Sequence, residues 1–142
     1  LRYFNVFGKR QSKEYAGVIK LFLEKIKQKM PPKINGDGLQ TRDFVHIDDV
    51  VRANISAMDS NIKHEFFNVG TENSISILDL ANVVIDASGL SLEPIYGPEL
   101  SGDVRSTRAD ITLIRKLLNW EPKMRLDDWL TKIISKKDFQ DI

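Results

Sequence analysis

The stretch of this sequence best suited to binding a ligand is a glycine-rich turn followed by an arginine. The turn spans residues 35–38 (Asn-Gly-Asp-Gly), and Arg42 begins the apolar segment that follows it. A guanidinium presents a planar fork of donors that matches the oxygens of a diphosphate, and glycines let the backbone approach a ligand closely. The alternative role for Arg42 is an ion pair with Asp37 or Asp43, which are near it in sequence. The spacing alone leaves both roles open.

Other polar residues have structural roles as alternatives to chemistry. Asn5 lies at the end of an apolar segment, where its amide could donate to phosphate oxygens or form an Asx turn toward Gly8. His46 lies within an apolar run, so we expect a core or capping histidine with satisfied hydrogen bonds rather than a catalytic one. Asp48 and Asp49 stand where a helix N-terminus favours negative charge, and we expect helix capping to explain this pair fully.

Strand-like and helix-like segments alternate along the chain and must position these residues. Short apolar runs predict strands at residues 1–7, 33–34, 42–47, 66–69 and 92–96. A helical period of apolar residues predicts helices at residues 15–30, 48–58, 77–88, 111–118 and 126–133. Ser76 and Asp79 form a capping-box-like pair before the third helix, Gly89 ends it, and Asp110 caps the fourth. This alternation predicts an α/β or mixed α+β fold.

Composition narrows the classes of protein to which the chain could belong. The 142 residues are 42% hydrophobic and 29% charged, and the net charge of +1 argues against a generic nucleic-acid binder. The chain has no cysteine, so we expect no metal site of the cysteine type and a reducing, cytoplasmic location. No apolar run approaches the ~18 residues that a membrane span needs, so we expect no membrane partner. The abrupt apolar start without a methionine suggests a truncated chain.

Residues 35–51 resemble, almost letter for letter, the pattern G-D-G-x-Q-T-R-D-F-V-H-v-D-D-V-v of nucleotide-sugar epimerases and dehydratases. These enzymes are extended short-chain dehydrogenase/reductases. Further stretches are similar to other motifs of the family, in the same order, at residues 1–8, 67–71, 102–111 and 117–122. Any one of these motifs alone would be a weak signal. Their order and spacing make the resemblance specific and extend it over almost the whole chain.

The resemblance implies that residues 1–142 are the C-terminal, nucleotide-sugar-binding half of such an enzyme, including strands that would complete its Rossmann-type sheet. Neither G-x-x-G-x-x-G nor Y-x-x-x-K occurs in the chain, so the NAD-binding domain and the catalytic tyrosine and lysine are expected in a missing N-terminal half. The parent is expected to be a homodimeric, NAD-dependent 4-epimerase of a UDP-hexose. Two alternatives stay open, namely a 4,6-dehydratase or decarboxylase of the same family and a non-catalytic binding module.

The resemblance also implies roles for single residues in binding a nucleotide sugar. Arg42 and Asn5 match family residues that hold the nucleotide phosphates. Asn35 lies on the turn expected to face the base and could have either a binding or a structural role. Asp103 matches an acid that accepts hydrogen bonds from ribose hydroxyls. Arg105 is a weaker candidate for phosphate binding. Solvation in the loop is the alternative role for Asp103.

Two aromatic residues are candidates for contact with the cofactor. Tyr3 and Phe4 are core residues on periodicity alone. The matching aromatic residues of the family border the nicotinamide and the sugar, so the resemblance implies that Tyr3 and Phe4 bind NAD.

One position departs from the family pattern. Many members carry an arginine two residues before the Gly-Asp pair, where it helps to hold the diphosphate, and this chain has Leu100 there. One expected cation is therefore missing, and Arg105 or Arg108 could replace it. The departure leaves the nucleotide and the subfamily open.

Overall fold

The computed structural model describes residues 1–11 and 17–139. Within these ranges the chain forms five helices and seven strands. The helices are α1 (Val18–Lys27), α2 (Ile47–Met58), α3 (Ile77–Ser88), α4 (Thr112–Leu118) and α5 (Leu126–Ser135). The strands are β1 (Arg2–Tyr3), β2 (Asn5–Phe7), β3 (Lys33–Asn35), β4 (Thr41–His46), β5 (Asn68–Val69), β6 (Ser74–Ser76) and β7 (Ile95–Gly97). Tyr15, which the sequence places in the first helix, lies outside the described residues.

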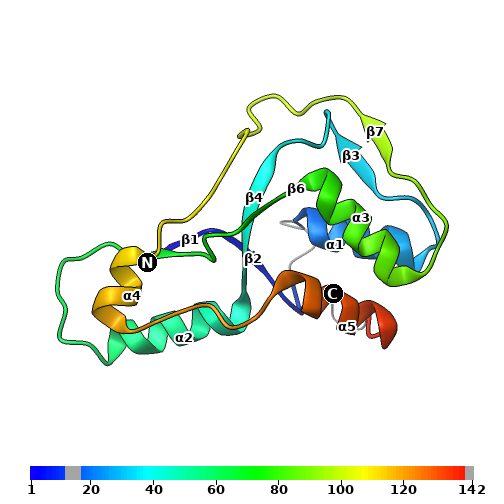
Figure 1. Ribbon diagram of the computed structural model, residues 1–142. Coiled ribbons are helices and arrows are strands. Elements are labelled where there is room, and N and C mark those ends of the chain that lie inside the picture. The colour runs from blue at the N-terminus through cyan, green and yellow to red at the C-terminus, as the bar shows by residue number, and fades with distance from the viewer. Residues whose placement is uncertain (12–16, 140–142) are drawn as a thin grey trace.

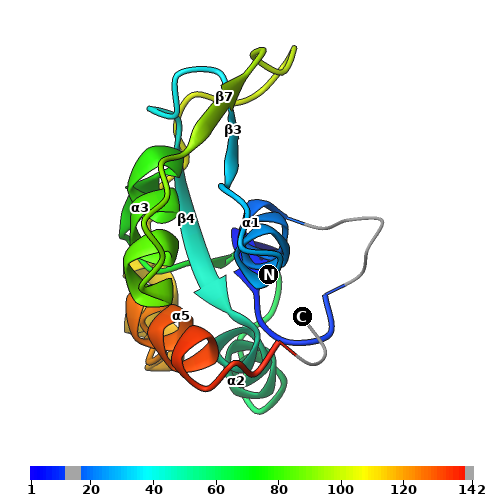
Figure 2. The same cartoon turned by 90° about the vertical axis from the view of Figure 1, so that its right-hand side faces the viewer.

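The strands pair into three small sheets. β1 pairs in parallel with β5, and β3 pairs in parallel with β7. β4 is the middle strand of the third sheet, parallel to β2 on one side and antiparallel to β6 on the other. Figure 1 shows α2 and α4 in one lobe and α1, α3 and α5 in the other, with β4 running between them. Figure 2 shows α1 on one side of β4 and α3 and α5 on the other.

The alternation of side chains along β4 joins two separate hydrophobic clusters. Successive residues of a strand point to opposite faces. Phe44 therefore packs into the cluster formed with α1, α3 and α5, whereas Val45 packs into the cluster formed with α2, α4 and β5. Both residues are buried, at 7% and 0% exposed. β4 thus contributes to the core of both lobes.

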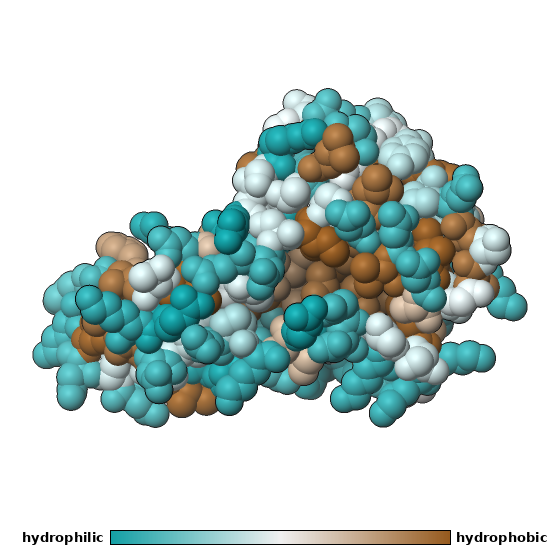
Figure 3. Space-filling view, viewed as in Figure 1, coloured by the Kyte–Doolittle hydropathy of each residue, from teal (hydrophilic) through white to brown (hydrophobic). Residues whose placement is uncertain are grey.

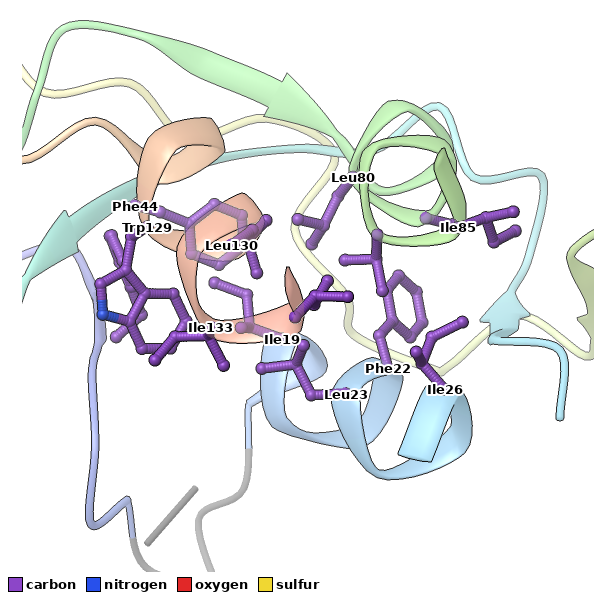
Figure 4. Packing of buried hydrophobic residues seen from close by; sticks show 14 of the residues in the cluster. Ile19, Phe22, Leu23, Ile26, Phe44, Leu80, Ile85, Trp129, Leu130 and Ile133 are labelled. Carbon is purple, nitrogen blue, oxygen red and sulfur yellow. The ribbon is translucent and has the colours of Figure 1, made fainter. Parts of the chain in front are cut away.

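The larger cluster is made by three amphipathic helices. Figure 4 shows side chains of all three helices gathered in this cluster, among them Phe22 of α1, Leu80 of α3 and Leu130 of α5. All three side chains are almost fully buried. Burying an apolar side chain of this size stabilises the fold by roughly 1.5–3 kcal/mol, so these contacts anchor the helices that flank β4.

The smaller cluster is closed by a tryptophan. Trp120 is 2% exposed, and its indole N–H donates to the backbone oxygen of Asp49 at 3.0 Å. Ala53 of α2 and Ile114 of α4 are fully buried in the same cluster. The bonded indole allows this large polar-tipped side chain to be buried without an unsatisfied donor.

The helix caps expected from the sequence are confirmed in two of three cases. The Ser76 hydroxyl accepts from the backbone N–H of Asp79 at 2.9 Å and donates to its carboxylate at 2.6 Å, which caps α3 as expected. Gly89 ends α3 with a φ of 66°, a left-handed conformation that glycine adopts without strain. Asp110 does accept from the backbone N–H of Thr112 at 2.9 Å, but the helix starts one residue later than expected.

The end of one helix and the presence of one strand differ from the expectation for a physical reason. The first helix ends at Lys27, not at residue 30, because Lys29 takes a φ of 56° and turns the backbone before the two prolines are reached. The strand β6 was not expected, since Ser74 and Ser76 give it no apolar pattern. Its pairing with β4, not its own composition, makes it a strand.

Candidate functional site

A cleft of about 470 Å³ brings together most of the predicted binding residues. Its walls are formed by β2, α1, β3, β4 and the loop that follows β7. Of the five residues expected to bind the nucleotide sugar, it is lined by Asn5, Asn35, Arg42 and Asp103. These residues are far apart in sequence, so the cleft is a product of the fold.

Strand register explains why the arginine and the asparagine meet. Arg42 and Phe44 are two residues apart on β4 and so share a face, and both line the cleft. Asn5 of β2 is the register partner of Phe44 in the parallel pair. The Asn5 side chain therefore lies beside the stretch of β4 that presents Arg42.

Arg42 forms an ion pair with Asp103 in the cleft. Its Nη2 donates to the Asp103 carboxylate and its Nη1 donates to the backbone oxygen of Thr41 at 2.8 Å. The Arg42 side chain is 13% exposed and that of Asp103 is 32% exposed. Neither Asp37 nor Asp43, the partners considered from sequence, is bound to Arg42 in the described structure. The observed partner lies 61 positions away, beyond what local spacing could indicate.

Asp43 has a structural role on the opposite face of β4. Its buried carboxylate accepts from the backbone N–H of Thr71 at 2.8 Å, the Thr71 hydroxyl at 2.6 Å and the backbone N–H of Ala109 at 3.0 Å. The two loops that carry these donors are in close contact, because a β-carbon added at Gly70 would lie 2.4 Å from the β-carbon of Ala109. The carboxylate thus ties two loops to the strand that carries Arg42.

Asn5 does not form the Asx turn toward Gly8. Its amide donates to the backbone oxygen of Asp43 at 3.1 Å and to the Thr107 hydroxyl at 3.5 Å. Both bonds fix the orientation of the side chain at the wall of the cleft. The amide oxygen of Asn5 has no donor among the described residues.

Arg105, the fifth predicted residue, lies outside the main cleft. Its guanidinium makes a bidentate pair with Asp37, at 2.9 and 3.0 Å. The bond to Arg105 holds the pKa of the Asp37 carboxyl below its ordinary value. Arg108 donates to the backbone oxygen of Glu72 at 2.8 Å. Neither arginine lines the cleft, whereas Leu100 does, with 55% of its surface exposed, and phosphate binding by Arg105 stays a prediction.

The two aromatic residues expected to bind the cofactor are separated from the cleft. Tyr3 is 48% exposed, and its hydroxyl donates to the side-chain oxygen of Asn54 at 2.9 Å. Phe4 packs against the smaller hydrophobic cluster. Neither is among the residues that line the cleft. The structure thus gives Phe4 the core role that periodicity indicated, and a contact with the cofactor stays a prediction for both.

His46 is a capping histidine, as expected. Its Nδ1 accepts from the backbone N–H of Asp48 at 3.2 Å, which caps α2. The ring packs edge-on against Phe7, with centroids 5.1 Å apart. Burial lowers the pKa of His46, although the neighbouring Asp48 and Asp49 act in the opposite direction. The neutral ring is the form that these contacts favour.

The expectation that capping fully explains the Asp48–Asp49 pair is wrong for one of the two residues. Asp48 is exposed at the start of α2. Asp49 is 1% exposed and accepts from the backbone N–H groups of Lys123 and Met124, at 3.0–3.1 Å. It also binds the guanidinium of Arg52. Asp49 therefore holds the segment between α4 and α5 in place.

Two further residues of the cleft had not been expected. Gln40 is 9% exposed, and its amide donates to the backbone oxygen of Asn35 at 2.8 Å, which fixes the glycine-rich turn. Lys33 lines the cleft from β3. Its spacing of two from Asn35 was the signal in the sequence, because residues two apart on a strand share a face.

A second hollow, of about 410 Å³, lies between β6, α3 and the start of α5. Figure 3 shows apolar side chains gathered in this region, where the two lobes meet. None of the predicted site residues lines it. The first cleft is therefore the candidate binding site.

The described residues were also compared with the requirements of a metal site and of a membrane-spanning helix. In residues 1–11 and 17–139, no group of three histidines, cysteines or acids is placed to hold a metal ion. None of the helices in these ranges has the length and apolar composition that crossing a bilayer requires.

Known proteins resemble this chain in both sequence and structure. The model of the NAD dependent epimerase/dehydratase family matches residues 1–70. UDP-glucose 4-epimerase of Mycolicibacterium smegmatis is 37% identical over 131 residues, which are 92% of this chain and 42% of that protein. UDP-glucuronic acid decarboxylase 1 of Arabidopsis thaliana is 31% identical over 134 residues, 94% of this chain and 31% of that protein.

A solved structure agrees with these relatives. The crystal structure of UDP-glucose 4-epimerase with UDP-glucose from Thermotoga maritima superposes with a TM-score of 0.89 at 38% identity, covering 98% of this chain and 46% of that one. The chain thus spans less than half the length of the proteins it matches. The expected α/β fold and the resemblance of the motifs are both confirmed.

Proposed function

The chain belongs to the NAD dependent epimerase/dehydratase family, and from this we propose that it is the nucleotide-sugar-binding portion of a UDP-hexose 4-epimerase. The observation that supports the proposal is the single cleft lined by Asn5, Asn35, Arg42 and Asp103. A diphosphate needs hydrogen-bond donors, and the guanidinium fork of Arg42 provides them at the wall of this cleft.

Each of these residues has a distinct part in the proposed binding. Arg42 binds the diphosphate after its pair with Asp103 opens, because a phosphate oxygen can replace the carboxylate on the guanidinium fork. Asp103 is then free to accept hydrogen bonds from ribose hydroxyls. Asn35 contacts the base, and Asn5 lies against the phosphates. Binding energy gained on these remote groups positions the reacting sugar.

NAD is proposed as the cofactor of the full-length enzyme, in line with the description of the family. NAD supplies the hydride acceptor and donor in a family of this kind. The residues of this chain do not form its cradle, since the sequence has no G-x-x-G-x-x-G turn after a strand. We therefore assign NAD binding mainly to residues outside residues 1–142, and the same holds for the catalytic tyrosine and lysine.

Titration of the chain with UDP tests the proposal. Calorimetry should detect binding, and Arg42→Ala should weaken it by about 1.5–3 kcal/mol, the range for hydrogen bonds to charged groups. Arg125→Ala is the matched control, because Arg125 pairs with Asp127 outside the cleft. Equal affinity of the Arg42 variant and the unaltered chain would return Arg42 to a structural role.

A decarboxylase or dehydratase of the same family is the second candidate. The relative from Arabidopsis thaliana that is named a decarboxylase supports it. The full-length enzyme distinguishes the two, because a decarboxylase releases carbon dioxide from UDP-glucuronic acid and a 4-epimerase interconverts UDP-glucose and UDP-galactose. A full-length protein that binds UDP and turns over neither substrate would favour a binding module.

We further propose that the full-length enzyme is cytoplasmic and forms a homodimer. Its mass in solution measures the oligomeric state.

A further inference from the structure

The cleft contains a lysine that no family motif accounts for. Lys33 and Asn35 lie two residues apart on β3, and both line the cleft. Ile34 between them is 0% exposed and packs into the larger hydrophobic cluster. The alternation of the strand therefore directs Lys33 to the same face as Asn35.

The side chain of Lys33 lies along the strand toward Asn35. Its register partner on β7 is Ile95, and the partner of Asn35 is Gly97. A β-carbon added at Gly97 would nevertheless lie 2.5 Å from Cε and 3.2 Å from Nζ of Lys33, and 3.4 Å from Oδ1 of Asn35. The missing side chain of Gly97 thus provides the space through which the ammonium reaches the end of β3.

Lys33 determines the net charge of the part of the cleft that the structure describes. Among the described residues that line it, the charged ones are Lys33, Arg42 and Asp103. Arg42 and Asp103 form an ion pair with each other. Lys33 has no hydrogen bond or ion pair with any other residue in the described part of the chain, so its charge is not compensated there.

We propose that Lys33 binds an anionic oxygen of the diphosphate and supplies the cation that the family pattern would otherwise place at residue 100. The inference rests on the proposed function, because it requires a nucleoside diphosphate in this cleft. An ammonium is a compact point charge on a flexible stem, so it can reach a phosphate oxygen without the fixed geometry of a guanidinium. Lys33 is a binding residue and has no part in hydride or proton transfer.

Removal of the Lys33 charge gives the first test. Lys33→Met keeps the length of the side chain and should raise the Kd for UDP roughly 10-fold at low salt, with a smaller effect at high salt. The affinity for uridine, which has no charge, should not change. Lys27→Met is the matched control, because Lys27 is exposed on α1 and does not line the cleft.

Gly97→Ala tests the position of the Lys33 side chain without removing the charge of Lys33. Gly97 does not have a positive φ, so alanine is compatible with the backbone, but its β-carbon must displace the end of Lys33. The variant should lose affinity for UDP in the same direction as Lys33→Met. The double variant should lose no more than Lys33→Met alone, because the two changes remove one interaction. A further, equal loss in the double variant would contradict this geometry.

The outcomes separate the two proposals. If the unaltered chain does not bind UDP, the proposed function fails and the inference about Lys33 fails with it. If the chain binds UDP and Lys33→Met binds it equally well, only the inference about Lys33 is overturned. Weaker binding of UDP and uridine alike would also overturn it, because the effect would then not depend on the phosphates.

Discussion

At the scale of single residues, the cleft is defined by which charges are already paired. Arg42 is bound to Asp103, and Arg105 is bound to Asp37 outside the cleft. Leu100 forms part of the wall with an exposed apolar surface. The position where the family often has an arginine is therefore open to solvent and near the proposed diphosphate.

A restored arginine at this position should tighten binding. In the Lys33→Met background, where the cation proposed to replace this arginine is gone, Leu100→Arg is expected to improve the affinity for UDP by about 1 kcal/mol, the upper range for an exposed ion pair, and the gain should shrink as salt rises. Calorimetry at two salt concentrations measures both effects. Val104→Arg is the control, because Val104 is 56% exposed in the same loop and does not line the cleft. An equal gain from both variants would mean that added charge acts without a specific site.

The buried histidine predicts how stability depends on pH. His46 has a pKa below its ordinary value of 6.5, mainly because of burial, so the unfolded chain binds more protons than the folded one as the pH falls. The free energy of unfolding should therefore decrease as the pH is lowered through about 6.5, by at most ~1.4 kcal/mol per pH unit for one proton.

Substituting the two histidines one at a time shows which of them causes the pH dependence of the free energy of unfolding. His46→Asn keeps a good N-cap for α2 and should remove most of the pH dependence between pH 5.5 and 7.5. His64, the other histidine, is exposed, and His64→Asn should leave the dependence in place. Urea denaturation across this range measures both variants. A pH dependence that survives His46→Asn unchanged would assign it to other groups.

At the scale of elements, the fold was predictable mainly where neighbouring residues carry a strong signal. The Ser76–Asp79 cap and the apolar period located α3 within a residue, because both are properties of neighbouring residues. β6 and the pairing of Arg42 with Asp103 were not predictable, since both depend on segments distant in sequence. The cleft could be predicted only as a set of residues, because its walls come from separate elements.

Asp49 illustrates the difference between a local and a distant role. Asp49→Ala should lower the free energy of unfolding by about 2–4 kcal/mol, because it leaves the backbone donors of Lys123 and Met124 and the nearby Arg52 without their partner. Asp48→Ala, at the exposed neighbouring position, should cost less than about 1 kcal/mol. Chemical denaturation of the two variants measures the difference. Equal losses would support capping as the role of both residues.

At the scale of the whole molecule, the chain exposes surfaces that are usually covered. β1 pairs only with β5 among the described strands, which leaves one edge of this small sheet free. On α2, a stripe of apolar side chains faces outward, with Val51 at 48%, Ile55 at 52% and Met58 at 83% exposed. Free edges and apolar stripes both favour association with another chain.

We expect the 142-residue chain to self-associate as its concentration rises. Ile55→Lys should reduce this association, because it places a charge in the apolar stripe of α2. Leu113→Lys serves as the control, since Leu113 is 39% exposed on a different helix. Sedimentation velocity over a range of concentrations measures the change. A stable monomer at high concentration would contradict the expectation.

The two-faced strand β4 has a consequence for directed evolution. Arg42 and Asp43 are adjacent, yet one faces the cleft and the other holds two loops. A library restricted to cleft positions such as 33, 42 and 100 should therefore alter ligand preference and leave both hydrophobic clusters intact. A deletion of one residue within β4 would exchange the two faces and lose binding and packing together. Selection for a new substrate can thus proceed by substitution in this strand, but not by a change in its length.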